Sequence, residues 1–181
     1  TSTPQFLATS PAANSVTLLN VTSELLTLPV GREPYSAACY LSPDRQLMAV
    51  VSNFAENTLS LIDVTRRTIV GSIADVPGSR SLSGIAVQGG RFAWVVGSDA
   101  NTVTVVDLTE RRITGRISVQ KPTSIIASIS SSGGIGTQTI FGVSSAAGIT
   151  FYNGSTLQPT ASFSITDVQY FALFGGGGVL A

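Results

Sequence analysis

The side chains best suited to chemistry in this sequence are acids and arginines, because the chain has no histidine and a single cysteine, Cys39. A serine or cysteine nucleophile needs a base, usually histidine, to activate it. Zinc sites take His and Cys ligands, and no calcium-binding run of the form D-x-D-x-D-G occurs. The sequence therefore predicts no catalytic residue, no metal and no cofactor. Cys39 lies in the small apolar run "YSAACYL" and is interpreted as a buried structural residue.

Two acidic residues recur at equivalent positions of near-identical segments, Asp63 at the end of "NTLSLID" and Asp107 at the end of "NTVTVVD". Two weaker copies of the segment carry asparagine there instead, Asn20 and Asn153. An exchange of Asp for Asn abolishes a general acid. It keeps a short side chain that accepts hydrogen bonds from backbone N–H groups in the following turn. We therefore expect structural turn residues at all four positions.

The segments that hold these residues repeat along the chain. "NSVTLLNV" begins at Asn14, "NTLSLIDV" at Asn57, "NTVTVVDL" at Asn101 and "AGITFYNG" at Ala147, with spacings of 43, 44 and 46 residues. A period in the mid-forties matches a blade of four strands, the unit of a β-propeller. The repetition thus indicates the architecture of the chain and not a duplicated active site.

Each repeat contains four strand-like segments separated by turn residues. The first is rich in small residues, as the innermost, crowded strand of a blade requires, and the last is the most polar. The middle two carry large apolar residues, which are expected to pack between neighbouring blades, and no helical pattern is visible. The core candidates are Leu47, Met48, Val50, Leu59, Leu61, Phe92, Trp94, Val103 and Val105.

The predicted fold is all-β, a single β-propeller domain of four-stranded antiparallel blades. The repeat units cover residues 1–30 in part, 31–77, 78–120, 121–166, and 167–181 in part. Two arrangements remain open: a ring of about four blades, closed by pairing the last strands with the first, or a fragment of a larger propeller. Unpaired strand edges in a fragment favour self-association.

One unit carries a recognisable set of motifs. Val30-Gly31 and Pro34 open it, Ser42-Pro43-Asp44 form a turn, and residues 57–63 supply "NTLSLID". In this it resembles the YVTN-type β-propeller repeat, although Arg45 stands where that family prefers glycine and the next unit has "QGG" in place of the turn motif. The resemblance implies a propeller fold in a surface or exported protein of unassigned role.

Composition limits the partners. Ten basic and ten acidic residues cancel, and charged residues make up only 11% of the chain, so neither nucleic acid nor an anionic membrane is expected to bind. A hydrophobic content of 43% excludes a disordered chain, and no uninterrupted apolar run reaches the roughly 18 residues of a membrane span. An uncharged polar surface is typical of exported proteins, so we expect an extracellular, periplasmic or cell-surface location.

The loops that enter each blade share one face of a propeller with the loops between the second and third strands. Ligands of propellers commonly bind where the central channel opens on this face, so these loops are the candidate binding site. Their polar and aromatic residues are Arg32, Glu33, Tyr35, Arg80, Lys121, Asp167, Gln169 and Tyr170. The expected partner is a protein or a glycan.

Three functions fit these features. The first is a non-enzymatic extracellular or cell-surface scaffold that binds a protein or glycan. The second is a hydrolase or lyase with acidic residues such as Glu33 or Asp167 at the channel. The third is a structural repeat of a surface layer or filament. The missing histidine favours the first.

Overall fold

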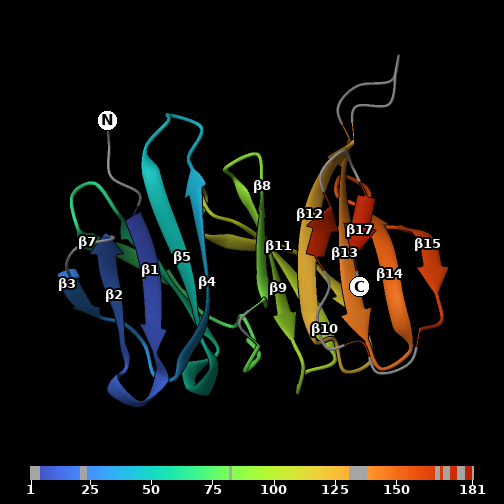
Figure 1. Ribbon diagram of the computed structural model, residues 1–181, viewed down its shortest axis with the longest axis horizontal. Helices are drawn as coiled ribbons and strands as arrows, with labels where there is room; N and C mark the ends of the chain where they lie inside the picture. Colours follow the sequence, from blue (N-terminus) through green and yellow to red (C-terminus); the bar gives the residue numbers. More distant parts are fainter. Residues whose placement is uncertain are drawn as a thin grey trace.

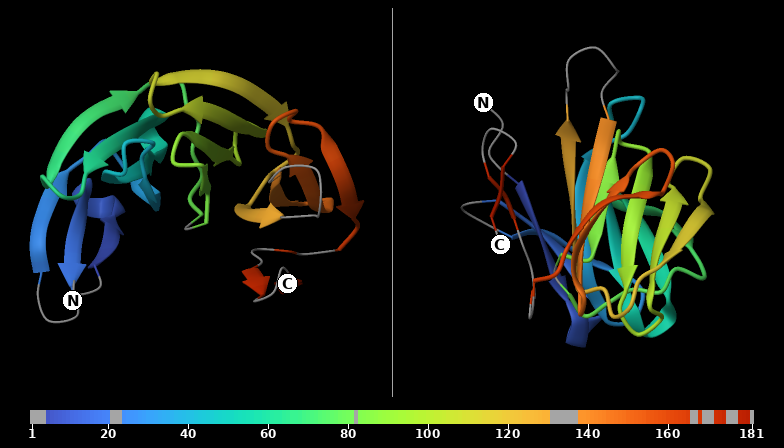
Figure 2. Two further views of the ribbon diagram at one scale, coloured as in Figure 1. Left: turned by 90° about the horizontal axis from the view of Figure 1, so that it is seen from above. Right: turned by 90° about the vertical axis from the view of Figure 1, so that its right-hand side faces the viewer.

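The computed structural model describes residues 5–20, 24–81, 83–130, 138–165, 168, 172–174 and 178–180. These residues form five antiparallel sheets that follow one another in chain order (Figure 1). Seen from above, the sheets stand side by side along an arc, with their first strands toward its inner side (Figure 2). No α-helix occurs among the described residues, and the two short helical turns are of the 3₁₀ type.

The strands are assigned to the sheets as follows. The first sheet holds β1 (Gln5–Ser10), β2 (Ser15–Asn20) and β3 (Glu24–Pro29), and the second holds β4 (Pro34–Leu41), β5 (Leu47–Asn53), β6 (Thr58–Asp63) and β7 (Thr68–Ile73). The third holds β8 (Ile85–Gln88), β9 (Phe92–Gly97), β10 (Thr102–Asp107) and β11 (Arg112–Ser118). The fourth holds β12 (Ser124–Ser130), β13 (Gln138–Ser145), β14 (Gly148–Asn153) and β15 (Pro159–Phe163), and the fifth holds β16 (Ala172–Phe174) and β17 (Gly178–Leu180).

Three of the sheets are four-stranded meanders, in which each strand pairs with the next one along the chain. This confirms the predicted all-β fold of four-stranded antiparallel blades. The alternative of ring closure by the last and first strands is not seen in the described residues. There β16 pairs with β17 and β1 pairs with β2, so the arc is open between the fifth and first sheets (Figure 2).

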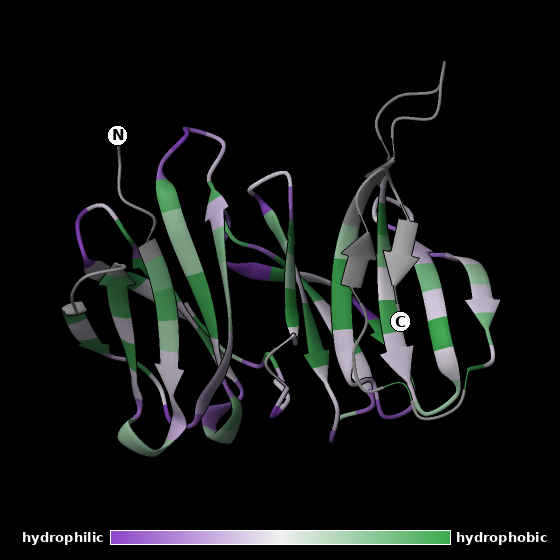
Figure 3. Cartoon of the chain, in the orientation of Figure 1, coloured by the Kyte–Doolittle hydropathy of each residue, from purple (hydrophilic) through white to green (hydrophobic). Residues whose placement is uncertain are grey.

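The core consists of apolar layers between adjacent sheets. Hydrophobic residues follow the middle strands, and hydrophilic residues gather in the turns (Figure 3). Between the third and fourth sheets, the Trp94 ring stacks on Phe141 with centroids 4.0 Å apart. Six of the predicted core residues are fully or almost fully buried: Val50, Leu59, Leu61, Trp94, Val103 and Val105.

Four predictions of burial are wrong. Leu47 is exposed, and Met48 and Phe92 are half-buried, because these residues begin their strands beside turns that are open to solvent. Cys39 is also exposed, since its strand β4 lies on the inner side of the open arc (Figure 2). The surrounding strand atoms still shield the thiol enough to raise its pKa, which lowers its thiolate fraction at neutral pH.

The asparagine that opens three of the four repeated segments has a structural role that the sequence did not reveal. Asn14, Asn57 and Asn101 adopt left-handed backbone conformations, with φ of 51°, 53° and 51°, which asparagine tolerates better than most residues. The three carbonyls accept hydrogen bonds, in the same order, from the backbone N–H groups of Val30, Val76 and Val119. Each asparagine thereby joins the hairpin that it starts to the segment that leaves the sheet.

Arg45 occupies the turn position at which the YVTN-type repeat prefers glycine. Its φ is 63°, a left-handed conformation that costs a residue with a Cβ about 1–2 kcal/mol. We expect Arg45→Gly to raise the free energy of unfolding by about 1 kcal/mol in urea titrations. Arg45→Ala is the control and should give no such gain, because alanine keeps the Cβ. Equal effects of the two variants would contradict this explanation.

Candidate functional site

The predicted binding loops lie on one face of the arc, which we call the entry face, together with the 3₁₀ turn η2 (Phe54–Glu56) that follows β5. The loop before β4 is fixed from both sides. The Glu33 N–H donates to Asn14 Oδ1 (3.0 Å). The Glu33 carbonyl accepts from the Phe54 N–H (2.9 Å) and the Arg32 carbonyl from the Ala55 N–H (3.3 Å). The loop is thus held between the first sheet and η2.

Two ion pairs cross this face. Arg32 Nε lies 3.2 Å from Glu56 Oε1, and Arg80 Nη2 lies 3.2 Å from Glu33 Oε2. The second pair joins the entry loops of the second and third sheets. Both arginines are more than half exposed, so each pair contributes at most about 1 kcal/mol to stability. The side chains therefore remain available to a partner at small cost.

An aromatic ring lies at the centre of these charges. The Arg80 guanidinium sits 4.4 Å from the centroid of the Phe54 ring, and Tyr35 meets that ring edge to face at 6.2 Å. We call the group formed by Arg32, Glu33, Tyr35, Phe54, Glu56 and Arg80 the Phe54 cluster. Sequence reasoning missed Phe54 and Glu56 because residues 53–57, "NFAEN", separate two strand-like segments and have the composition of a turn. The signal available there was a large aromatic residue in a short polar loop.

The remaining predicted site residues do not join this cluster in the described structure. Lys121 precedes β12 on the same face, where its N–H donates to Asn101 Oδ1 (2.8 Å). Its φ of 43° repeats the left-handed conformation of Glu33 in the equivalent loop. Asp167, Gln169 and Tyr170 lie outside the described residues.

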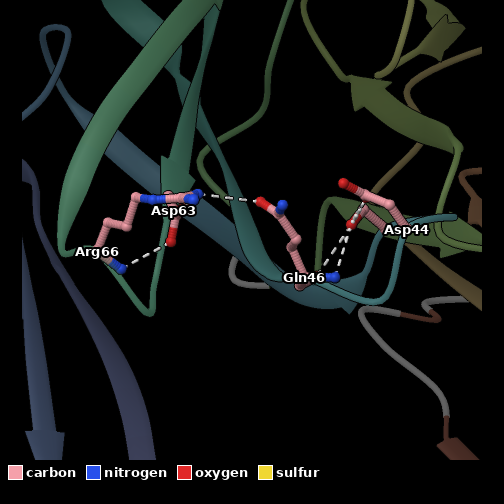
Figure 4. A network of polar contacts seen from close by, with 5 residues as sticks. Asp44, Gln46, Asp63 and Arg66 are labelled. Atoms are coloured by element: carbon pink, nitrogen blue, oxygen red, sulfur yellow. Dashed lines mark hydrogen bonds and ion pairs between the residues drawn. The ribbon is translucent and has the colours of Figure 1, made fainter.

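The residues predicted to fix turns lie on the opposite side of the arc, which we call the hairpin face. Asp63 Oδ1 accepts from the Arg66 N–H and its Oδ2 from Arg66 Nη1, both at 2.7 Å (Figure 4). Asn153 Oδ1 accepts from two backbone N–H groups, those of Ser155 and Thr156. Asn20 ends β2. Bonds of this kind fix the turn that follows a strand.

Asp107 combines a turn with an ion pair. Its Oδ1 accepts from the Thr109 and Glu110 N–H groups, and its Oδ2 accepts from Arg91 Nε (2.9 Å) and Nη2 (2.7 Å). Burial raises the pKa of this carboxyl, but the bonds from Arg91 and the two backbone N–H groups outweigh it, and the pKa is lowered. For Asp63 the backbone N–H of Arg66 lowers the pKa most, followed by its guanidinium. Neither carboxylate is suited to general acid chemistry at neutral pH.

These lowered pKa values predict acid sensitivity. The stabilisation from Asp63 and Asp107 is fully present above their ordinary pKa of about 4 and is lost as the pH falls through the folded values. We expect the urea midpoint to fall between pH 6 and pH 3. This fall should be smaller in Asp107→Asn, which keeps the turn bonds and lacks the charge. An unchanged pH dependence in that variant would show that the Arg91 pair does not contribute.

The described residues also bear on metal centres and membrane-spanning helices. No group of three or more His, Cys, Asp and Glu side chains there is placed to hold a metal ion. None of the helical segments in the described part has the length and apolar character needed to cross a membrane.

Comparison with known proteins places the fold. No protein-family model matches the chain, and no curated protein matches it. Among solved structures, BBS1N in complex with ARL6DN gives a TM-score of 0.64 at 15% identity, over 90% of this chain and 52% of that chain. Dihydro-heme d1 dehydrogenase NirN gives 0.63 at 14% identity, over 90% and 35%. Hydrazine synthase of Kuenenia stuttgartiensis gives 0.62 at 19% identity, over 80% and 40%.

These neighbours are β-propeller-type folds. At identities of 14–19%, the likeness shows the fold alone. The chain spans between 35% and 52% of the lengths of these proteins. Their names describe both enzymes and a protein in a complex, so the shared fold does not select a function for this chain.

Proposed function

We propose that the chain is a non-enzymatic binding scaffold that contacts a protein or glycan partner through the Phe54 cluster. The observation that carries this proposal is the convergence of predicted loop residues from two sheets around one aromatic ring. Tyr, Phe and Arg are enriched at the centres of protein interfaces, where they bury large areas and form hydrogen bonds. The two ion pairs orient the arginines before a partner arrives.

The chemistry of the cluster supports binding more than turnover. Glu33, the acid suggested for a hydrolase or lyase, forms an ion pair with Arg80. A second carboxylate facing it is not found among the described members of the cluster, apart from Glu56, which pairs with Arg32. The proposal extends to membership of the YVTN-type repeat proteins and to an exported or cell-surface location, supported by the motifs and the uncharged polar composition.

Phe54→Ala tests this function. Glycan arrays and surface-protein libraries probed with the purified chain should yield a ligand that Phe54→Ala binds about tenfold or more weakly, as expected for loss of a central aromatic contact. Lys121→Ala, on the same face and outside the cluster, is the matched control and should bind normally. If Phe54→Ala binds the ligand as well as the native chain does, the binding site is not the Phe54 cluster. Catalytic turnover of any substrate in a broad panel would contradict the proposal that the chain is a non-enzymatic scaffold.

A further inference from the structure

A hollow of about 470 Å³ opens on the hairpin face between the third and fourth sheets. One wall comes from the third sheet, and the other comes from the turn between β14 and β15, which contributes Gly154, Ser155 and Leu157. Sites for small molecules have volumes of about 300–1,000 Å³. The hollow is therefore large enough to hold a small ligand between the two sheets.

The wall from the third sheet is a row of side chains that crosses all four strands. Gln88 of β8 lies opposite Phe92 of β9, which lies opposite Asp107 of β10. Asp107 in turn lies opposite Arg112 of β11. Residues directly opposite each other on antiparallel strands point to the same face of the sheet. That face is the one toward the fourth sheet, because Trp94, two residues along β9 from Phe92, stacks on an aromatic ring of β13.

The hollow carries a positive charge that pairs with no carboxylate in the described structure. Asp107 is the acid of the lining, and both of its oxygens already accept two hydrogen bonds each. Two of these bonds come from Arg91, so the two charges cancel within one ion pair. Glu110 acts on Arg91 through its charge but does not line the hollow. Arg112 has no hydrogen-bond or ion-pair partner in the described residues, so its guanidinium is available to an anion.

Two neutral polar groups of the lining are also available. The Gln88 amide reaches across the interface, since a Cβ added to Gly154 would lie 3.0 Å from both its Nε2 and its Oε1. Neither this amide nor the Ser155 hydroxyl forms a hydrogen bond within the described part of the chain. An amide and a hydroxyl both donate and accept hydrogen bonds, as the hydroxyl groups of a sugar do. Phe92 and Leu157 add apolar surface to the lining.

The second sheet lacks this combination. Its corresponding row, which passes through the counterpart of Asp107, consists of Tyr40, Met48, Asp63 and Thr68. A tyrosine and a threonine thus stand at the places of Gln88 and Arg112. The available cation and amide are therefore not part of the pattern that builds every blade.

We propose that this hollow binds a hexuronate, a sugar ring that carries one carboxylate. The carboxylate pairs with the Arg112 guanidinium, whose planar fork matches two carboxylate oxygens. The ring hydroxyls bond the Gln88 amide and the Ser155 hydroxyl, and the C–H groups of the ring lie against the apolar surface. The hollow and the Phe54 cluster lie on opposite sides of the arc, so the two sites are tested independently.

The experiment titrates the ¹⁵N-labelled chain with the methyl glycosides of glucuronate and galacturonate and follows amide shifts by NMR. We expect saturable shifts at residues of the hollow with at least one of the two sugars. The matching neutral glycosides, of glucose and galactose, should bind about tenfold or more weakly, because they lack the carboxylate. Hyaluronate and polygalacturonate contain the same sugars. They bind if the hollow accepts an internal unit of a polysaccharide and fail to bind if it accepts only a free sugar.

Variants identify the groups that bind. Arg112→Gln should weaken binding by about tenfold or more, and its exposed position makes a folding defect unexpected. Arg116→Gln removes the same charge from the opposite side of β11, where Nη2 donates to the Asp75 carbonyl, and should bind normally. Gln88→Ala should weaken binding of the hexuronate and leave binding of cyclohexanecarboxylate unchanged, because that ring has the carboxylate but no hydroxyl groups.

Four outcomes would overturn the proposal. They are the absence of binding by both acidic glycosides, equal affinity for the neutral glycosides, equal losses in Arg112→Gln and Arg116→Gln, and equal affinity for cyclohexanecarboxylate. The third would show attraction by the general charge of the surface, and the fourth would identify a site for carboxylates of any kind.

Discussion

Trp94→Ala is expected to lower the free energy of unfolding by about 3–5 kcal/mol, the range for truncating a buried aromatic residue. Trp94 is fully buried on β9. Its ring stacks on Phe141 of β13 and lies 6.4 Å from the ring of Tyr152 on β14. These contacts join the third sheet to the fourth, so the variant leaves a cavity at the interface that the aromatic rings now fill.

Trp94→Phe distinguishes the contribution of aromatic packing from the cost of the unpaired indole N–H. Trp94 Nε1 is buried and has no hydrogen-bond partner among the described residues, which carries a cost of about 1–3 kcal/mol. Phenylalanine loses packing area but removes that cost, so we expect it to destabilise much less than alanine does. Urea titrations followed by circular dichroism are suited to this comparison, since the chain has only one tryptophan. Similar losses in the two variants would show that stacking is not the main contribution.

Gly90→Ala is expected to destabilise the fold by about 2–5 kcal/mol, the combined cost of a strained backbone and an overpacked contact. Gly90 has a φ of +68°, and a Cβ there would lie 1.8 Å from the Leu41 carbonyl oxygen. Because the obstacle is backbone and not a flexible side chain, the turn before β9 must move away from the end of β4. This movement would open the contact between the second and third sheets on the hairpin face.

Gly89→Ala is a matched control in the same turn. Gly89 has a similar φ of +56°, but a Cβ there meets nothing within 4 Å. It should therefore show the backbone strain alone, about 1–2 kcal/mol. Thermal unfolding of the two variants side by side measures the difference. Equal losses would mean that the close approach to Leu41 relaxes without cost.

The period of the repeats and the alternation within them were enough to predict the sheets and most of their core. Trp94 and the valines of β10 are buried because strand alternation and blade packing act together. Leu47 and Cys39 were mispredicted because their exposure depends on what stands opposite them in space. Local apolar character carries no information about an adjacent open turn or about the inner side of an arc.

The candidate site was predicted in part. The blade order alone was enough to place Arg32, Glu33, Tyr35 and Arg80 on one face, and the structure brings them together. The blade order could not predict that Phe54 contacts Arg80 and Tyr35, because the position of Phe54 depends on the η2 turn and on the left-handed backbone of Glu33.

The open arc has a consequence for how the molecule loses its structure. The apolar layers connect the sheets one after another, because each four-stranded sheet shares apolar clusters only with the sheets beside it. The apolar layer between the third and fourth sheets contains the stacked pair of Trp94 and Phe141, whereas the other two layers are formed mainly by aliphatic side chains. Amide hydrogens should then exchange in steps, sheet by sheet, with the third and fourth sheets protected longest as a pair.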